Sequence, residues 1–161
     1  MAFWIVCGCI LLPFLLFFLL GYFAFRATLR RRARYPADRR EFGGGSPLPQ
    51  KGLETLKASR DWLDSQTLEA ASVRSCDGLT LKGSILHAEG EAKGVVILFH
   101  GYHSSCRRDL SVQSMLLHRA GYHLLLVTHR SHGDSEGKYI CFGVKERGDV
   151  PLWCGLAQSR L

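Results

Sequence analysis

The clearest pattern in the chain is a pair of continuously apolar runs separated by an amphipathic segment. The runs cover residues 95–99 and 123–127, and a polar loop follows each of them. Residues 109–119 lie between the runs, carry helical spacing and end shortly before Gly121. Strand, helix and strand in this order predict a βαβ unit with parallel strands. Because both runs are apolar throughout apart from His123, rather than alternating with polar residues, we expect helices to cover both faces of the sheet.

Weaker patterns on either side add an antiparallel pair and a closing helix. Residues 70–74 and 79–87 are strand candidates, and the Asp-Gly dipeptide at 77–78 between them is a strong hairpin signal. Within residues 143–161, one helical face can be formed by Val144, Val150, Trp153, Leu156 and Ala157, and Asp149 is a suitable N-cap for that helix. The expected fold class is therefore α/β, with an antiparallel hairpin followed by the βαβ unit.

The N-terminus stands apart from this pattern. Residues 2–25 contain no charge and consist mainly of Leu, Phe and Ile. A helix of roughly 20 apolar residues crosses the hydrocarbon core of a bilayer, and a proline such as Pro13 is tolerated in such a helix. A cleaved signal peptide is the alternative, but the chain has no basic n-region, the apolar run is longer, and no small-residue cleavage site follows. We predict a retained transmembrane helix.

Positive charge is concentrated directly after the apolar run. Residues 26–40 contain seven arginines and one acidic residue, Asp38, which gives +6 of the net +7 of the whole chain. The remaining chain has 14 basic and 13 acidic residues, or +1. The positive-inside rule then predicts a single-pass protein of the cell membrane with its larger part in the cytoplasm. Arginines here can also contact anionic lipid head groups. A basic arm for nucleic acid is the alternative. We expect the lipid bilayer as partner and no nucleic acid, since the excess charge is local.

Composition divides the chain into three parts. Residues 2–25 are the predicted transmembrane helix, 26–50 a basic juxtamembrane segment with a Gly/Pro-rich linker, and 51–161 the α/β domain. Acylation of the two cysteines in the apolar run, Cys7 and Cys9, stays open. The other four lack C-x-x-C spacing, which indicates reduced thiols; they are Cys76, Cys106, Cys141 and Cys154.

A Gly-x-Ser-x-Gly motif lies at 133–137 and raises the possibility of a serine hydrolase with Ser135 as nucleophile. In a nucleophile elbow the serine sits on a sharp turn between a strand and a helix. Here the strand ends several polar residues before Gly133, and no helical pattern follows Gly137. We therefore interpret Ser135 as a structural residue of a glycine-rich loop and disfavour it as nucleophile.

The turn after the first apolar run has a better claim to chemistry. His100, Gly101 and Tyr102 follow that run directly, at the carboxyl end of a predicted parallel strand, where α/β sheets bind ligands. The backbone N–H of Tyr102 is suitably placed to serve as half of an oxyanion hole. The alternative is an ordinary turn in which Gly101 only permits the bend.

Histidines in the two polar loops also invite a metal-site interpretation. The four are His100, His103, His129 and His132. No H-E-x-x-H or paired carboxylate pattern accompanies them, so we expect no metal and no cofactor.

Taken together, residues 95–102, the helix up to Gly121, and the loop 129–137 resemble the α/β-hydrolase superfamily. More narrowly, they and the hairpin 75–83 are similar to bacterial membrane-anchored members of the serine-aminopeptidase-like (S33-type) group. The likeness covers residues 53–161. It implies that Tyr102 supplies an oxyanion-hole N–H, that the loop 129–137 is structural, and that the nucleophile elbow, acid and histidine follow after a fifth strand. Residues 51–161 are then a partial α/β-hydrolase domain that ends before the elbow.

Three hypotheses follow. The first is a truncated membrane-anchored hydrolase that cleaves small ester or peptide substrates if a downstream or complementing C-terminal half completes it, and that is inactive alone. The second is a non-catalytic membrane-anchored binding or assembly module. The third is a small enzyme that uses Ser135 with a local histidine such as His132. We expect the first.

Overall fold

The computed structural model describes residues 2–31 and 49–161 of the chain. Among residues 2–10 it describes the backbone only. The chain divides into two compact units, of which the first ends at Arg30 and the second begins at Arg31. The predicted linker and several arginines of the basic segment, at 32–48, lie outside the described residues.

The first unit is a single helix, α1 (Ala2–Leu29). Over residues 11–29 it is long and apolar enough to cross a membrane, although signal sequences and buried core helices meet the same criterion. The helix continues beyond the predicted end at residue 25. This is expected physically, because charged residues such as Arg26 end an apolar stretch without interrupting the backbone hydrogen bonds of a helix.

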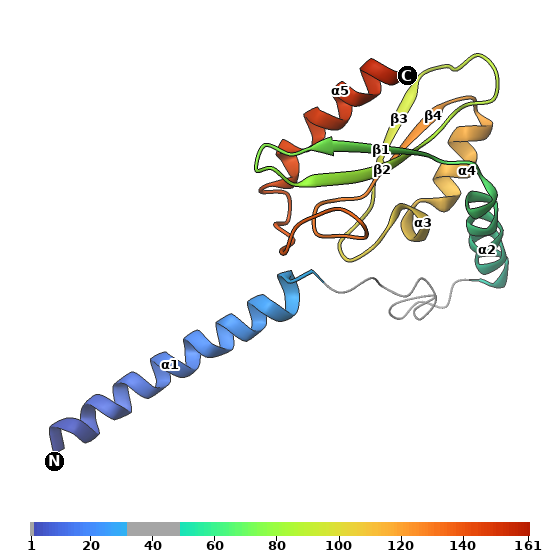
Figure 1. Cartoon of the computed structure of the whole chain (residues 1–161). Coiled ribbons are helices and arrows are strands. Elements are labelled where there is room, and N and C mark those ends of the chain that lie inside the picture. Colours follow the sequence, from blue (N-terminus) through green and yellow to red (C-terminus); the bar gives the residue numbers. More distant parts are fainter. Residues whose placement is uncertain (1, 32–48) are drawn as a thin grey trace. The chain divides into compact units, whose positions relative to one another are not determined.

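The second unit contains a four-stranded mixed sheet with the order β1-β2-β4-β3 (Figure 1). β1 (Glu69–Arg74) and β2 (Thr80–Leu86) pair in the antiparallel sense, as the hairpin signal predicted. β3 (Val95–Phe99) and β4 (His123–Val127) are parallel, which confirms the predicted βαβ unit. β2 pairs antiparallel with β4 and joins the two halves of the sheet.

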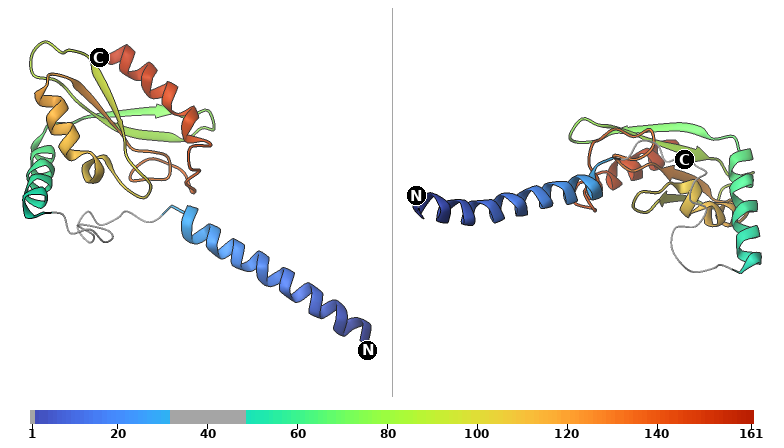
Figure 2. Two further views of the ribbon diagram at one scale, coloured as in Figure 1. Left: turned by 180° about the vertical axis from the view of Figure 1, so that it is seen from behind. Right: turned by 90° about the horizontal axis from the view of Figure 1, so that it is seen from below.

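Helices cover both faces of this sheet. α2 (Gln50–Ser65) and α4 (Ser111–Arg119) pack on one face, and α5 (Val150–Arg160) packs on the other (Figures 1 and 2). A short helix, α3 (Cys106–Asp109), precedes α4, and a 3₁₀ turn, η1 (Glu146–Gly148), precedes α5. The helix predicted over residues 109–119 is α4, which begins at Ser111 rather than at Asp109 because Leu110 leaves the helical region with φ −125°; α3 was not predicted.

Burial along β4 explains why its sequence does not alternate. Leu124 and Leu126 face the core beneath α2 and α4, whereas Leu125 and Val127 face the core beneath α5. All four side chains are buried. A strand between two helical layers needs apolar residues on both of its faces, and this strand has them.

The indole of Trp153, on α5, is fully buried against the sheet. It packs over Gly83 of β2, where an added Cβ would lie 3.0 Å from both the Trp153 ring and the Leu126 carbonyl oxygen. Glycine at this position therefore lets the largest buried side chain approach the strand closely.

Candidate functional site

The loops that follow the parallel strands meet at one edge of the sheet. β3 leads into the His100–Gly101–Tyr102 turn and β4 leads into the segment that begins at Thr128. The His100 ring lies 4.9 Å, centroid to centroid, from the rings of both His129 and His132. The structure thus brings the predicted turn and the histidine-containing loop together.

Two imidazoles connect these loops through backbone hydrogen bonds. The His129 N–H donates to His100 Nε2 at 3.2 Å, and the His103 N–H donates to His132 Nε2 at 3.1 Å. The Nδ1 atom of His100 lies 2.8 Å from the Gly101 carbonyl oxygen, and that of His132 lies 2.9 Å from the Arg130 carbonyl oxygen. Each ring therefore accepts at Nε2 and donates at Nδ1, which assigns both as the neutral Nδ1–H tautomer.

This assignment agrees with the surroundings of the rings. Burial lowers the pKa of His100 and of His132 below the ordinary 6.5, because a charged imidazolium is poorly solvated there. Both ring nitrogens of each residue are already used to hold backbone groups. Within the described ranges, no group of three or more histidine, cysteine or acidic side chains is arranged to hold a metal ion.

The His-Gly turn itself is held by a carboxylate. Asp109 Oδ2 accepts the Gly101 N–H at 2.9 Å, and Asp109 Oδ1 accepts the Ser104 hydroxyl. The Tyr102 side chain is 45% exposed and stacks on Phe142 with ring centroids 5.0 Å apart. The predicted oxyanion residue therefore lies on a braced, accessible turn at the carboxyl end of β3, the position at which α/β sheets bind ligands.

The serine of the Gly-x-Ser-x-Gly motif occupies a different environment. Ser135 is fully buried, and its Oγ accepts the Lys82 N–H at 2.8 Å and donates to the Thr128 carbonyl at 2.7 Å. These bonds connect β2 with the residue after β4. A hydroxyl enclosed in this way offers no approach for a substrate carbonyl, and all of its hydrogen bonds run to backbone atoms rather than to a histidine.

The glycines of the motif serve the same loop. Gly137 adopts φ +123°, and a Cβ there would lie 2.5 Å from Ser131 Oγ. Gly133 adopts φ +45°, and a Cβ there would lie 3.0 Å from a Thr128 methyl carbon. The spacing of the motif thus reflects a tight loop rather than a strand-to-helix elbow.

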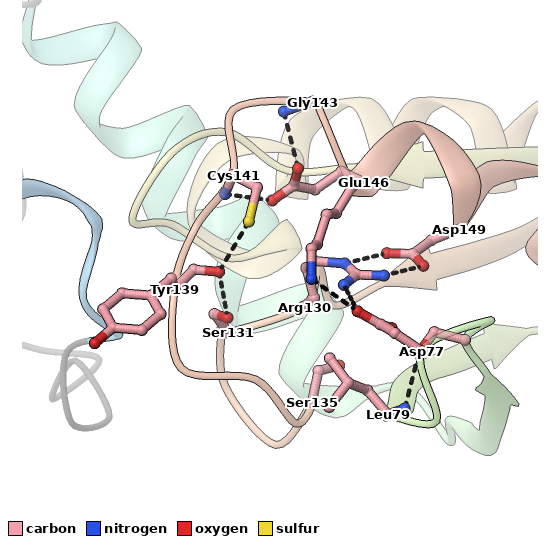
Figure 3. Close-up of polar contacts among 12 residues, drawn as sticks. Asp77, Leu79, Arg130, Ser131, Ser135, Tyr139, Cys141, Gly143, Glu146 and Asp149 are labelled. Carbon is pink, nitrogen blue, oxygen red and sulfur yellow. Dashed lines mark hydrogen bonds and ion pairs between the residues drawn. The ribbon is translucent and has the colours of Figure 1, made fainter.

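A buried arginine holds this loop to its neighbours (Figure 3). Arg130 forms a bidentate pair with Asp149, at 2.8 and 2.7 Å, and its Nη1 reaches Asp77 Oδ2 at 2.8 Å. The hydrogen bonds from Arg130 lower the pKa of Asp77, and those to Asp149 raise the pKa of Arg130. The network links the β1–β2 turn, the loop after β4 and the start of α5.

Asp149 differs from its predicted role. It occupies the N-cap position of α5, but its side chain makes no capping hydrogen bond. Both carboxylate oxygens bind Arg130 instead, because a buried guanidinium needs a bidentate partner more than a helix end needs a side-chain cap. The sequence did not predict the roles of Arg130 and Asp109. Arg130 depends on partners far away in the sequence, and Asp109 depends on a turn geometry that residue spacing does not reveal.

The chain is similar in structure to esterase Pf2001 of Pyrococcus furiosus. One crystal structure of that esterase matches with a TM-score of 0.54 at 24% sequence identity, covering 83% of this chain and 43% of the esterase chain. A second crystal form matches with a TM-score of 0.51 at 26% sequence identity, covering 72% of this chain and 40% of the esterase chain. DcsB, in complex with its substrate analogue, matches with a TM-score of 0.51 at 18% sequence identity, covering 59% of this chain and 33% of the DcsB chain.

No family model matches the sequence, and no curated protein does either. The chain spans less than half the length of the esterase chains that it resembles. The fold is therefore α/β, with a partial mixed sheet that matches part of the esterase fold.

Proposed function

We propose that this chain is the N-terminal half of a membrane-anchored serine hydrolase and supplies one side of its active site. The backbone N–H of Tyr102 acts as an oxyanion-hole donor toward the carbonyl of a small ester or peptide substrate. The nucleophile, the acid and the catalytic histidine come from sequence beyond this chain, either as its continuation or as a complementing second polypeptide. Alone, the chain is catalytically silent.

One observation carries this proposal. The His-Gly turn lies braced and accessible at the carboxyl end of β3, whereas Ser135 is fully buried and bonded to backbone. Oxyanion donors act by stabilising the charge that develops on the substrate oxygen, and an oxyanion hole without a triad retains only a small part of the rate of a complete enzyme. The arrangement therefore supports a contributing half rather than an independent catalyst.

The membrane anchor is a part of the same proposal. The length and apolar composition of α1 and the arginines that follow it support a single-pass anchor with the second unit in the cytoplasm. The resemblance of the hairpin 75–83 and of the His-Gly turn to bacterial anchored hydrolases supports the serine-aminopeptidase-like group.

The test uses the purified full chain in detergent micelles. A fluorophosphonate probe, which labels activated serines covalently, is added in parallel to the native chain and to Ser135→Ala, and hydrolysis of p-nitrophenyl acetate is followed. We expect no labelling and no turnover above the detergent blank for either protein. Labelling of the native chain that disappears in Ser135→Ala would overturn the proposal in favour of a local serine enzyme.

A non-catalytic binding or assembly module is the second candidate. It is favoured by the two clusters of buried apolar residues, one on each face of the described sheet, which give this half a core of its own. This candidate predicts that the full chain melts cooperatively and remains monodisperse. A broad, non-cooperative melt of the second unit counts against it and agrees with a half that requires completion.

A further inference from the structure

The turn that carries Tyr102 is held at both backbone groups of Gly101, one in the His100–Gly101 peptide and one in the Gly101–Tyr102 peptide. The Gly101 carbonyl accepts a hydrogen bond from His100 Nδ1, and the Gly101 N–H donates to Asp109 Oδ2. The Gly101–Tyr102 peptide is trans, so its carbonyl and the Tyr102 N–H point in opposite directions. Fixing the Gly101 residue therefore fixes the direction in which the Tyr102 N–H points.

Asp109 is well suited to this task because both of its oxygens bind the same turn. One accepts the Gly101 N–H and the other accepts the Ser104 hydroxyl. A Cβ on Gly101 would lie 3.0 Å from the Asp109 oxygen, so glycine at that position gives the carboxylate room for its close approach. This close approach links the glycine of the His-Gly turn to the aspartate eight residues later.

The element that carries Asp109 is itself firmly attached. Ser105 Oγ caps the start of α3, and Arg107 forms a bidentate pair with Asp64 on α2 at 2.6 and 2.5 Å. The Cys106 Sγ lies 3.3 Å from the Val127 carbonyl oxygen and 3.5 Å from that of Leu98, so its single S–H has an acceptor near the end of each parallel strand. Burial raises the pKa of this thiol to about 12, so it stays protonated as a donor. The carboxylate is therefore held by the framework rather than by a mobile loop.

We infer that Asp109 is a positioning residue: its carboxylate fixes the His100–Gly101 peptide and, through Gly101, helps His100 to orient the following peptide, whose N–H belongs to Tyr102. The inference deepens the proposed function and rests on it for its catalytic meaning. Its structural content, the coupling of Asp109 to the Tyr102 N–H, can be measured without substrate.

The experiment uses the full chain in detergent micelles with ¹⁵N incorporated only at tyrosine. The chain has five tyrosines, and Tyr102→Phe identifies the Tyr102 signal. We expect Asp109→Ala to shift that signal, since loss of a charged acceptor releases the turn. Asp109→Asn keeps an acceptor oxygen for Gly101 and is expected to retain the native signal.

Asp61→Ala is the matched control, because Asp61 is an exposed aspartate on α2. It is expected to leave all five signals unchanged. An unchanged Tyr102 signal in Asp109→Ala would overturn the inference, and so would equal disturbance of all the tyrosines, which would mean that Asp109 only supports the fold. Neither result depends on hydrolase activity, so a failure of the proposed function is recognised separately by the fluorophosphonate experiment.

Discussion

Ser135 stabilises the sheet through its hydroxyl, and its removal tests that role. In Ser135→Ala the Lys82 N–H and the Thr128 carbonyl each lose a buried partner. An unmet buried group costs about 1–3 kcal/mol, so we expect the free energy of unfolding to fall by that amount. Urea denaturation followed by tryptophan fluorescence measures it. Ser65→Ala, at an exposed site on α2, is the control and should change stability little. An unchanged free energy of unfolding in Ser135→Ala would contradict the structural role of the Ser135 hydroxyl.

Arg130 is the residue on which the loop network depends most. Arg130→Ala leaves the Asp149 carboxylate, whose side chain is 4% exposed, without its bidentate partner. Removing one partner of a buried pair typically costs about 3–5 kcal/mol, and we expect a loss of this size in urea denaturation.

Arg130→Lys serves as the matched variant for that prediction. Lysine keeps the charge but cannot form the planar two-bond contact with Asp149. The free energy of unfolding of this variant should therefore lie between those of Arg130→Ala and the native chain. Equal stability of the lysine variant and the native chain would show that charge alone, rather than bidentate geometry, holds the loop.

At the scale of elements, the two histidine-linked loops predict a dependence of stability on pH. Burial lowers the pKa of His100, His129 and His132 in the folded chain, so the unfolded chain binds more protons below the ordinary value of 6.5. The stabilisation is therefore complete above pH 6.5 and is lost as the pH falls through the lowered folded values. Nearby carboxylates raise these pKa values but do not cancel the effect of burial. Asp109 acts on His100, and Glu146 acts on His129 and His132.

Urea denaturation at pH 7.5 and at pH 5.0 measures this effect. We expect a lower free energy of unfolding at pH 5.0 than at pH 7.5. The difference between these two free energies should be smaller in His132→Gln, because this substitution removes one titrating ring. Stability that rises on acidification to pH 5.0 would contradict the neutral tautomers assigned to His100 and His132.

The packing of α5 on the sheet gives a second prediction at this scale. In Gly83→Ala the new methyl group meets the Leu126 carbonyl and the Trp153 ring at 3.0 Å, and overpacking of this kind costs about 1–3 kcal/mol. Gly155→Ala is the matched control within α5, where a Cβ meets nothing within 4 Å. That change should stabilise the chain by about 0.5–1 kcal/mol through helix propensity. Equal effects of the two substitutions would contradict the close approach of Trp153.

The elements that the sequence predicted well are those specified by local pattern. Continuous apolar runs identified β3 and β4, and the Asp-Gly dipeptide identified the hairpin. The short helix α3 was not predicted and α4 was predicted to begin at Asp109 rather than Ser111, because the Ser105 cap and the non-helical Leu110 leave no signal in the apolar spacing. Asp149 occupies the predicted N-cap position of α5, but its carboxylate binds Arg130, 19 residues away, instead of capping the helix. Local patterns predict elements, whereas side-chain roles depend on which distant groups the fold brings together.

At the scale of the whole molecule, β3 is the point at which the described sheet stops. It has β4 on one side and, within the described part of the chain, no strand on the other. The esterase chains that resemble this one are more than twice as long as the segment that matches. An unpaired apolar edge strand is a site for adding a further strand, which agrees with completion of the sheet by sequence beyond this chain.

The most direct test of the account is the identity of the serine-reactive protein in the native membrane. Membranes from the source cells are treated with the fluorophosphonate probe, and an antibody against residues 50–161 recovers the product for intact-mass analysis. The account predicts a labelled species about twice the 18.0 kDa of this chain, or a labelled second polypeptide recovered with it. Recovery of an 18.0 kDa species with neither label nor labelled partner would contradict the hydrolase proposal and favour the non-catalytic module.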